Sequence, residues 1–272
     1  MSMSNATLSK ERSEYLKKKK IRKTSVLFTQ IFILAALIAS WEILANLGVI
    51  DSFLMSQPSR IVKTFLNLSA NDLPLHLGVT CYETLTGFLL GACGGTLLAV
   101  ALWWSDFLSQ VMEPYLVVLN SLPKIALGPV IIIWVGAGTQ AIIVMALAIS
   151  LIVTVLEMLN GFLATDPEKI KMARTFGASR MQILQKIVFP SNLTTLFNSL
   201  KINIGLSLVG VIAGEFLVSK AGLGYLIVYG GQVFKLDLVM TSVIILAVMA
   251  AVLYQAVVIL EKYVSKRISH LG

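Results

Sequence analysis

Long apolar runs separated by short polar stretches dominate the hydrophobic pattern of this chain. Six runs are long enough to be membrane-spanning helices, because about 20 apolar residues cross the hydrocarbon core. They cover approximately residues 25–47, 78–104, 107–135, 139–163, 191–218 and 237–260. The pattern therefore predicts an all-α, polytopic membrane protein with six transmembrane helices.

The third run is interrupted in its middle. Pro123, Lys124, Gly128 and Pro129 lie within it, and proline removes a backbone hydrogen bond and bends a helix. Opened backbone at membrane depth is tolerated only where protein or a water-filled cavity covers it. We therefore expect a broken third span that contributes to a translocation path or gate at these four residues.

The second run carries glycines four residues apart, Gly87 and Gly91. Small residues at this spacing let two helices approach closely. We expect them to pack against another helix of the same chain, with a seam between two copies as the alternative.

Several ionisable residues fall inside the predicted spans, where each is energetically expensive and therefore a candidate for function. They are Glu83, Glu113, Lys124, Glu157, Lys201 and Glu215. Lys124 together with Lys201 would favour an anion along the path. The alternative is a lysine that snorkels to the interface or forms an internal ion pair with a glutamate. Glu215 precedes a Gly-Leu-Gly loop and is a candidate support of an outer gate.

Residues 164–190, between the fourth and fifth runs, predict a hairpin of two short helices. Asp166 is placed to cap the first helix and Gly177 to end it in a left-handed turn. Ser179 followed by Gln182 is a capping box for the second helix, and Pro190 is expected to stop it.

The first helix of this hairpin is amphipathic. Ile170, Ala173 and Phe176 repeat at helical spacing, whereas Lys171 and Arg174 lie off that stripe. A compact basic hairpin of this kind suits a protein partner in water. Anionic lipid headgroups are the alternative partner.

The net charge of +8 belongs to a chain that is 57% hydrophobic and only 13% charged. Its positive residues cluster beside apolar runs, which excludes a nucleic-acid-binding surface. Sixteen lie in residues 1–24, in the hairpin and after the sixth run, and four lie in the loops of the other side. Positive residues accumulate on the cytoplasmic side. We therefore expect both termini and the hairpin in the cytoplasm.

No pattern of an enzyme is present. The sequence has no Walker-type phosphate loop and no Cys/His metal spacing. Cys81 and Cys93 share one predicted span and are interpreted as buried structural thiols.

The run KMARTFGASRMQILQKIVFP resembles the cytoplasmic loop of ABC-importer permeases. Ala173, Gly177, Ile187 and Pro190 stand at matching places. Lys171-Met172 replaces the acid and first alanine of the family's Glu-Ala-Ala triplet, and Phe189 replaces a leucine. Basic residues there are usual in the nitrate/sulfonate/taurine branch. The Pro-rich run ending in Trp-Val-Gly-Ala-Gly and the Gly-Leu-Gly loop add to the resemblance.

The resemblance implies a type I ABC-importer permease fold in the bacterial inner membrane, with a cytoplasmic tail (1–24) and a permease domain (25–272). Implied partners are nucleotide-binding ATPase subunits, which hold ATP and Mg, a second permease copy as a homodimer, an external substrate-binding protein and the bilayer. The permease itself would bind no cofactor or metal and catalyse no reaction. The ATPase-coupling residues would be Ile170, Lys171, Ala173, Arg174, Phe176, Gly177, Ala178 and Ser179.

The implied solute is a small oxyanion such as an aliphatic sulfonate, taurine, nitrate or bicarbonate, or instead a thiamine precursor or related heterocycle. One alternative function is a secondary transporter driven by an ion gradient. That class is expected to show an inverted repeat with paired broken helices, whereas this sequence has one broken span. A non-transport scaffold is a further alternative, which would need the hairpin but not the broken span.

Overall fold

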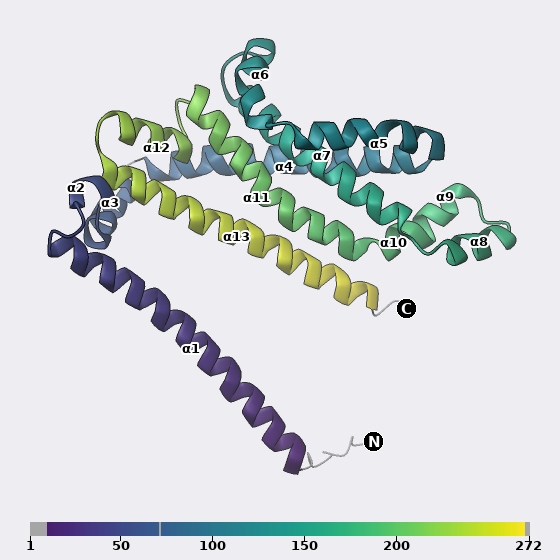
Figure 1. Ribbon diagram of the computed structural model, residues 1–272, viewed down its shortest axis with the longest axis horizontal. Helices are drawn as coiled ribbons and strands as arrows, with labels where there is room; N and C mark the ends of the chain where they lie inside the picture. The colour runs from purple at the N-terminus through teal and green to yellow at the C-terminus, as the bar shows by residue number, and fades with distance from the viewer. Residues whose placement is uncertain (1–9, 71, 270–272) are drawn as a thin grey trace. The chain divides into compact units, whose positions relative to one another are not determined.

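The computed structural model describes residues 10–70 and 72–269, which are helical over most of their length (Figure 1). The chain divides into two compact units, residues 1–63 and residues 64–272. The first nine residues of the predicted cytoplasmic tail lie outside the described residues.

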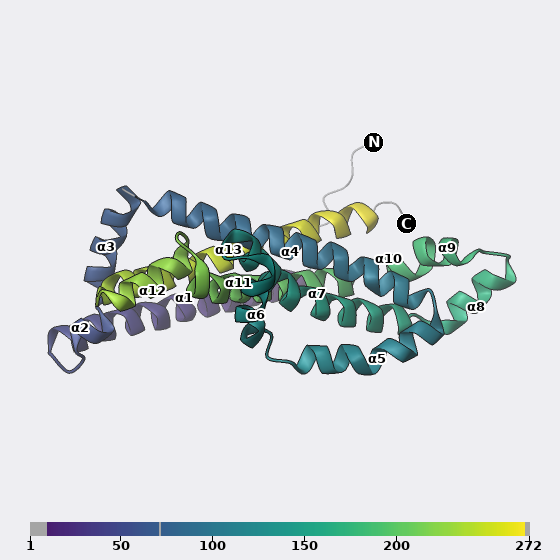
Figure 2. The ribbon, with the colours of Figure 1, turned by 90° about the horizontal axis from the view of Figure 1, so that it is seen from above.

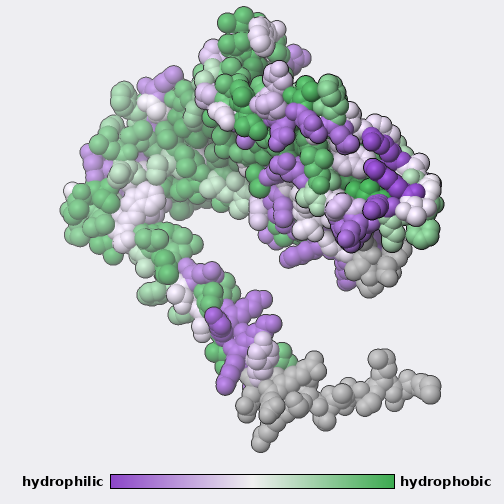
Figure 3. Space-filling view, turned by 45° about the vertical axis from the view of Figure 1, so that its right-hand side comes forward, coloured by the Kyte–Doolittle hydropathy of each residue, from purple (hydrophilic) through white to green (hydrophobic). Residues whose placement is uncertain are grey.

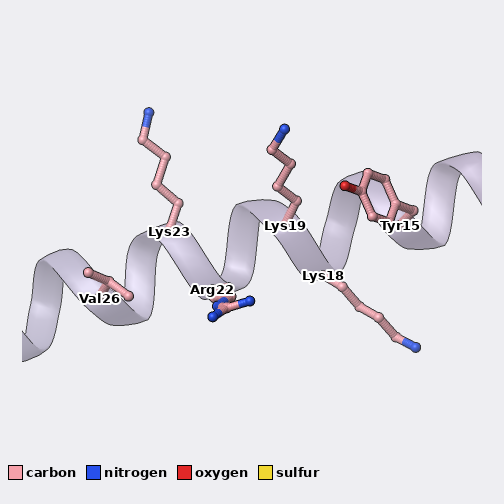
Figure 4. A pocket seen from close by; sticks show the side chains of 6 residues that line it. All are labelled: Tyr15, Lys18, Lys19, Arg22, Lys23 and Val26. Atoms are coloured by element: carbon pink, nitrogen blue, oxygen red, sulfur yellow. The ribbon is translucent and has the colours of Figure 1, made fainter.

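The first unit consists of α1 (Lys10–Asn46), α2 (Ser52–Met55) and the beginning of α3 (Pro58–Ala70). The predicted span at residues 25–47 corresponds to the C-terminal part of α1, which ends at Asn46, but the helix begins much earlier. Its basic stretch is therefore helical, because lysine and arginine are good helix formers. Figure 4 shows Lys19 and Lys23 pointing to one side of α1 and Lys18 to another.

Twelve further elements complete the second unit. They are α4 (Leu73–Trp103), α5 (Asp106–Ser121), the 3₁₀ turn η1 (Lys124–Leu127), α6 (Gly128–Val135), α7 (Thr139–Leu163), α8 (Pro167–Thr175), α9 (Arg180–Ile183), the π-helical turn η2 (Leu184–Val188), α10 (Phe189–Ser191), α11 (Leu193–Val218), α12 (Leu223–Gln232) and α13 (Leu236–Ser269).

The predicted all-helical, membrane-spanning architecture is confirmed within the described residues. Five helices are long and apolar enough to cross a membrane, and the bent pair formed by α5 with η1 and α6 makes a sixth span when it is counted as one. The bend between its two parts is 85°. The predicted interruption of the third span therefore falls between Ser121 and Lys124.

Helix α7 lies at the centre of the second unit, and α4 packs against one side of it. Three glycines at every fourth position of α4 meet three small residues at every fourth position of α7. The pairs are Gly87–Ala146, Gly91–Ser150 and Gly95–Thr154. A Cβ atom built on Gly87 would lie 2.6 Å from the Ala146 Cβ. The expected packing of Gly87 and Gly91 within the chain is thus confirmed.

Helix α11 packs against α7 at equally close range. A Cβ atom on Gly210 would lie 2.7 Å from the Ala146 Cα. Because Ala146 is met by α4 and by α11, its small side chain permits both approaches at one level of the bundle. Three helices remote in sequence are thereby held together without large side chains between them.

Two apolar clusters stabilise the opposite ends of this bundle. One includes Phe162 of α7 and Val188 of η2, both completely buried, and lies next to α8 and α9. We call this the hairpin end. The other includes Leu73 of α4 and Leu223 of α12, and we call it the loop end. Figures 1 and 2 both show α8–α9 and α12 at opposite ends of the second unit.

Candidate functional site: the hairpin, the broken span and the anchored loop

The first helix of the hairpin begins and ends as the sequence predicts. The Asp166 side chain accepts a hydrogen bond from the Glu168 backbone N–H at 2.9 Å and caps α8. Gly177 follows α8 with a φ of 78°, in the left-handed region that favours glycine. A side chain there would enter open space, so the glycine serves the turn rather than an internal contact.

The second helix has the predicted capping box. The Gln182 backbone N–H donates to the Ser179 hydroxyl at 3.3 Å, and the Ser179 backbone N–H donates to the Gln182 side chain at 2.8 Å. The expectation that Pro190 stops this helix is wrong, because the chain stays helical to Ser191. The π-helical turn η2 directly before α10 changes the hydrogen-bond spacing, and Pro190 sits in the first turn of α10, where a missing N–H costs little.

The apolar residues of the hairpin face in two directions. Ile170, Ala173 and Ala178 pack against the cluster at the hairpin end. Phe176 is 84% exposed and Met172 is 58% exposed. The predicted stripe is therefore divided: Ile170 and Ala173 attach the hairpin to its own molecule, and Phe176 remains free for a partner.

The polar surface of the hairpin is basic. Lys171, Arg174 and Ser179 are exposed, as are Lys169 and Arg180. In the space-filling view, hydrophilic side chains gather at the end that carries α8 and α9, and hydrophobic ones cover the middle of the bundle (Figure 3). The hairpin thus combines an exposed aromatic ring with positive charge.

Asn192 connects the segment that enters the hairpin to the segment that leaves it. Its buried side chain donates to the Thr165 hydroxyl at 2.8 Å and to the Val188 carbonyl at 2.8 Å. Thr165 precedes α8 and Asn192 follows α10. Gly161 of α7 permits this approach, since a Cβ atom there would lie 2.7 Å from the Asn192 amide oxygen.

Arg180 connects the hairpin to a third helix. Its guanidinium donates to the backbone carbonyl of Trp104, the C-cap residue directly after α4. The terminal carbonyls of a helix lack intrahelical donors, and a cation there is favoured by the helix dipole. The hairpin is therefore bonded to α4 as well as being continuous with α7 and α10–α11.

The predicted break in the third span holds Lys124 at the bend. Pro123 precedes η1, and the Lys124 ammonium donates to the Asn120 backbone carbonyl at 2.8 Å. It thereby occupies a carbonyl near the end of α5. Gly128 allows α6 to approach α7, because a Cβ atom there would lie 2.9 Å from the Met145 methyl carbon. Pro129 is in the first turn of α6.

Lys201 has a partner of opposite charge. Its ammonium lies 2.7 Å from a carboxylate oxygen of Glu261, which joins α11 to α13. The structure thus pairs Lys201 with Glu261 and Lys124 with Asn120. This agrees with the alternative in which Lys201 forms an internal ion pair.

Glu215 lies in α11 at the loop end and fixes the loop before α12. It is only 2% exposed. One carboxylate oxygen accepts from the Thr80 hydroxyl at 2.6 Å, and the other accepts from the Gly224 backbone N–H at 2.5 Å. Gly222 has a φ of 114°, and a Cβ atom on it would overlap the Glu215 carboxylate. The Gly-Leu-Gly sequence is therefore required by close approach to Glu215.

Two residues of α4 complete this anchor and were not identified from the sequence. Thr80 accepts from the Leu223 backbone N–H at 2.8 Å, and His76 Nδ1 accepts from the Gly222 backbone N–H at 2.9 Å. The sequence feature that could have identified them is their spacing, because His76 and Thr80 are one helical turn apart and therefore share a face of α4.

This fold and chain match known transport proteins. Residues 91–270 match the model of the family described as the binding-protein-dependent transport system inner membrane component. The chain belongs to this family.

Relatives of this permease are named for different solutes. The putative aliphatic sulfonates transport permease protein of Bacillus subtilis (strain 168) is 26% identical over 96% of this chain and 95% of its own length. The formylaminopyrimidine transport permease protein of Halalkalibacterium halodurans is 26% identical over 70% of this chain and 75% of its own.

The fold also matches that of a solved structure. The crystal structure of a bacterial ABC transporter involved in the import of the acidic polysaccharide alginate has a chain with a TM-score of 0.62 and 15% identity. The match covers 90% of this chain and 98% of that one. The permease is thus a multi-pass, non-catalytic inner-membrane component that carries no cofactor, and ATP hydrolysis belongs to a separate subunit.

Proposed function

We propose that this permease forms, as a homodimer, the path for a small oxyanion-type solute delivered by an external binding protein. The solute class is an aliphatic sulfonate, taurine, nitrate or bicarbonate. The relative named for aliphatic sulfonates supports it, because the match extends over 96% of this chain. The relative named for formylaminopyrimidine makes a thiamine precursor or related heterocycle the alternative.

A second copy would complete the path at the broken span. Ile133 and Trp134 of α6 are each 80% exposed, and an aromatic residue so exposed is typical of an interface or of a lipid boundary. The 85° bend turns α6 away from the direction of α5. The gate candidates Pro123, Lys124, Gly128 and Pro129 all lie at or after that bend.

The hairpin docks on the ATPase subunit in the cytoplasm, where both termini also lie. The observation that carries this proposal is Phe176, 84% exposed at the turn after α8 and flanked by Arg174 and Gly177. An exposed aromatic ring fits an apolar cleft on a partner, and aromatic residues dominate such contacts energetically. The exposed residues Lys171 and Ser179, together with the half-buried Ala178, would form the edge of the contact.

Force would pass from the hairpin into three helices. Closure of two ATPase subunits on ATP displaces the hairpins. Asn192 holds α7 and α11 together at the base, and Arg180 extends the connection to α4. The helices then tilt as a group, and the path between two copies switches its opening from one side to the other.

The docking proposal is tested by placing a charge at Phe176. Phe176→Glu should leave the permease in the membrane but abolish co-purification of the co-expressed ATPase and solute uptake. Phe234→Glu is the matched control, since Phe234 is 71% exposed and follows α12 at the loop end. Retention of the ATPase by Phe176→Glu, or its equal loss in both variants, would contradict docking by Phe176.

The solute class is tested by uptake in a strain that lacks this chain. Loss of sulfonate, taurine, nitrate or bicarbonate uptake, restored by the cloned gene, supports the proposal. Restored uptake of a thiamine precursor alone supports the heterocycle alternative. Restored uptake that continues without ATP would contradict an ABC importer and favour a secondary transporter.

A further inference from the structure

Two glutamates approach each other in the interior of the bundle at the loop end. Glu83 of α4 is 0% exposed, and Glu215 of α11 is 2% exposed. Glu83 shares a face of α4 with Thr80, three residues earlier, and the Thr80 hydroxyl donates to Glu215 at 2.6 Å. The two carboxyl groups therefore lie close enough to interact. Both belong to helices that span the membrane.

The hydrogen-bond partners of the two carboxyl groups are unequal. Glu215 accepts from Thr80 and from the Gly224 backbone N–H. Both carboxyl oxygens of Glu83 are buried without a hydrogen-bond partner among the described residues, and so is the hydroxyl of Thr84. The side chain of Thr139, at the start of α7, also faces Glu83. The two buried oxygens of Glu83 are therefore open to a further ligand, with the side chains of Thr139 and Glu215 beside them.

No basic side chain neutralises this pair within the described part of the chain. The elements around it carry His76 and Asp72 near the start of α4, Lys220 before α12, Tyr225 and Tyr229 in α12, Asp237 in α13 and Lys124 in η1. None of these is bonded to Glu83. His76 Nδ1 is occupied by the Gly222 backbone N–H, and Lys124 by Asn120.

Two neighbouring buried negative charges without a cation are strongly unfavourable. Removing a single ion from water costs several kcal/mol in a protein interior, and repulsion between like charges adds to that cost. Either a bound proton or a bound metal ion removes one of the two charges. Carboxylate oxygens can share a proton, and carboxylate and hydroxyl oxygens can serve as ligands of a metal ion.

We propose that Glu83 and Glu215 together hold one monovalent cation, a proton shared by the two carboxyl groups or an alkali ion between them, behind the Gly222–Gly224 loop. In the first case the proton is bonded to a Glu83 oxygen and donated to Glu215. In the second, the unpartnered Glu83 oxygens supply ligands. The cation relieves the repulsion that would otherwise displace Glu215 from Gly224 and Thr80, so its presence holds the loop in place.

The test is the thermal unfolding midpoint of the purified permease with its co-expressed ATPase. One arm exchanges Na⁺ for K⁺ or choline at constant pH and ionic strength. The other raises the pH from mildly acidic to mildly alkaline in choline. A bound alkali ion predicts a midpoint several degrees higher in Na⁺ or K⁺ than in choline, and a shared proton predicts a midpoint that falls at alkaline pH.

Three variants make the result specific. The glutamine of Glu83→Gln is neutral and nearly isosteric, and its amide can donate to Glu215. This variant should therefore remove the dependence of the unfolding midpoint on alkali ions and on pH. Glu157→Gln is the matched control, because Glu157 of α7 also has a buried, unpartnered oxygen but lies near the other end of its helix. His76→Gln removes the imidazole, so any pH dependence of the unfolding midpoint that remains in this variant belongs to the Glu83–Glu215 pair.

The wild-type protein also decides the question if Glu83→Gln fails to fold. Its infrared spectrum should contain a carboxylic-acid C=O band for a shared proton, or its midpoint should respond to alkali ions. A midpoint that responds to neither pH nor alkali ions would overturn the proposal. If Glu83→Gln folds and its unfolding midpoint depends on pH or alkali ions as in the wild-type protein, the proposal is overturned as well.

Discussion

Glu215 shows how one side chain determines the sequence around it. Its carboxylate accepts a backbone hydrogen bond at Gly224, and Gly222 passes so near that a Cβ atom would overlap it. Glycine is needed at residue 222 for two separate reasons, the positive φ and the lack of space. These two reasons can be separated by experiment because Gly136 has only the first.

Gly222→Ala should destabilise the permease more than Gly136→Ala. Both positions have positive φ with extended ψ, 114° and 168° at Gly222 and 93° and 157° at Gly136, so alanine costs about 1–3 kcal/mol at each. Only at Gly222 does the new Cβ meet Glu215, whereas nothing lies within 4 Å at Gly136. Overpacking adds about 1–3 kcal/mol. Thermal unfolding of the two variants checks this, and equal midpoints would contradict a tight anchor at Glu215.

At the scale of elements, the glycine face of α4 determines how the bundle packs. Gly91 meets Ser150 of α7, whereas Gly94 has only the Leu151 side chain at 3.5 Å. In a membrane, association of helices depends on close van der Waals packing rather than on the hydrophobic effect. The distance between α4 and α7 is therefore determined by the size of residues on this face.

Gly91→Ala is expected to lower the unfolding midpoint and the yield of folded permease. Its added methyl would overlap Ser150, at a cost of about 1–3 kcal/mol. Gly94→Ala should be neutral or slightly stabilising, because alanine is the better helix former. Fluorescence-detected size exclusion of both variants measures this directly. The same profile for the two would show that the α4–α7 contact is not tight.

The ion pair between α11 and α13 provides a second prediction at this scale. Lys201→Met alone should destabilise the permease, because Glu261 keeps its charge without its partner. Adding Glu261→Gln should restore stability. Uptake by the double variant decides the role of Lys201: normal uptake is expected from a structural ion pair, and lost uptake in a stable double variant would support a role in an anion path.

The sequence predicted these elements unevenly, for physical reasons. Long apolar runs specify spans, and the caps at Asp166 and Ser179 are local signals that the structure confirms. The effect of Pro190 was wrongly predicted because a π-helical turn depends on packing around Val188, which has no local signature. The anchor of Glu215 joins residues 135 positions apart in sequence, so no local pattern could reveal Thr80 as its partner.

At the scale of the whole molecule, the two ends of the second unit differ in their side chains. The hairpin end carries an exposed ring and positive charge, and the loop end carries a buried, anchored loop. The long helices α4, α7 and α11 connect the two ends. Force applied at the hairpin can therefore reach the loop through helices that are packed together along their length.

The central claim, that the hairpin receives this force from a cytoplasmic ATPase, is tested most directly by labelling Phe176→Cys with a membrane-impermeant maleimide. The two native cysteines are first replaced by serine. Cys81 is half-buried and Cys93 is exposed, so the interpretation of both as buried thiols is wrong. We predict labelling in inside-out vesicles but not in right-side-out ones, and slower labelling when the ATPase is bound. Labelling from the outside, or a rate unaffected by the bound ATPase, would contradict the claim.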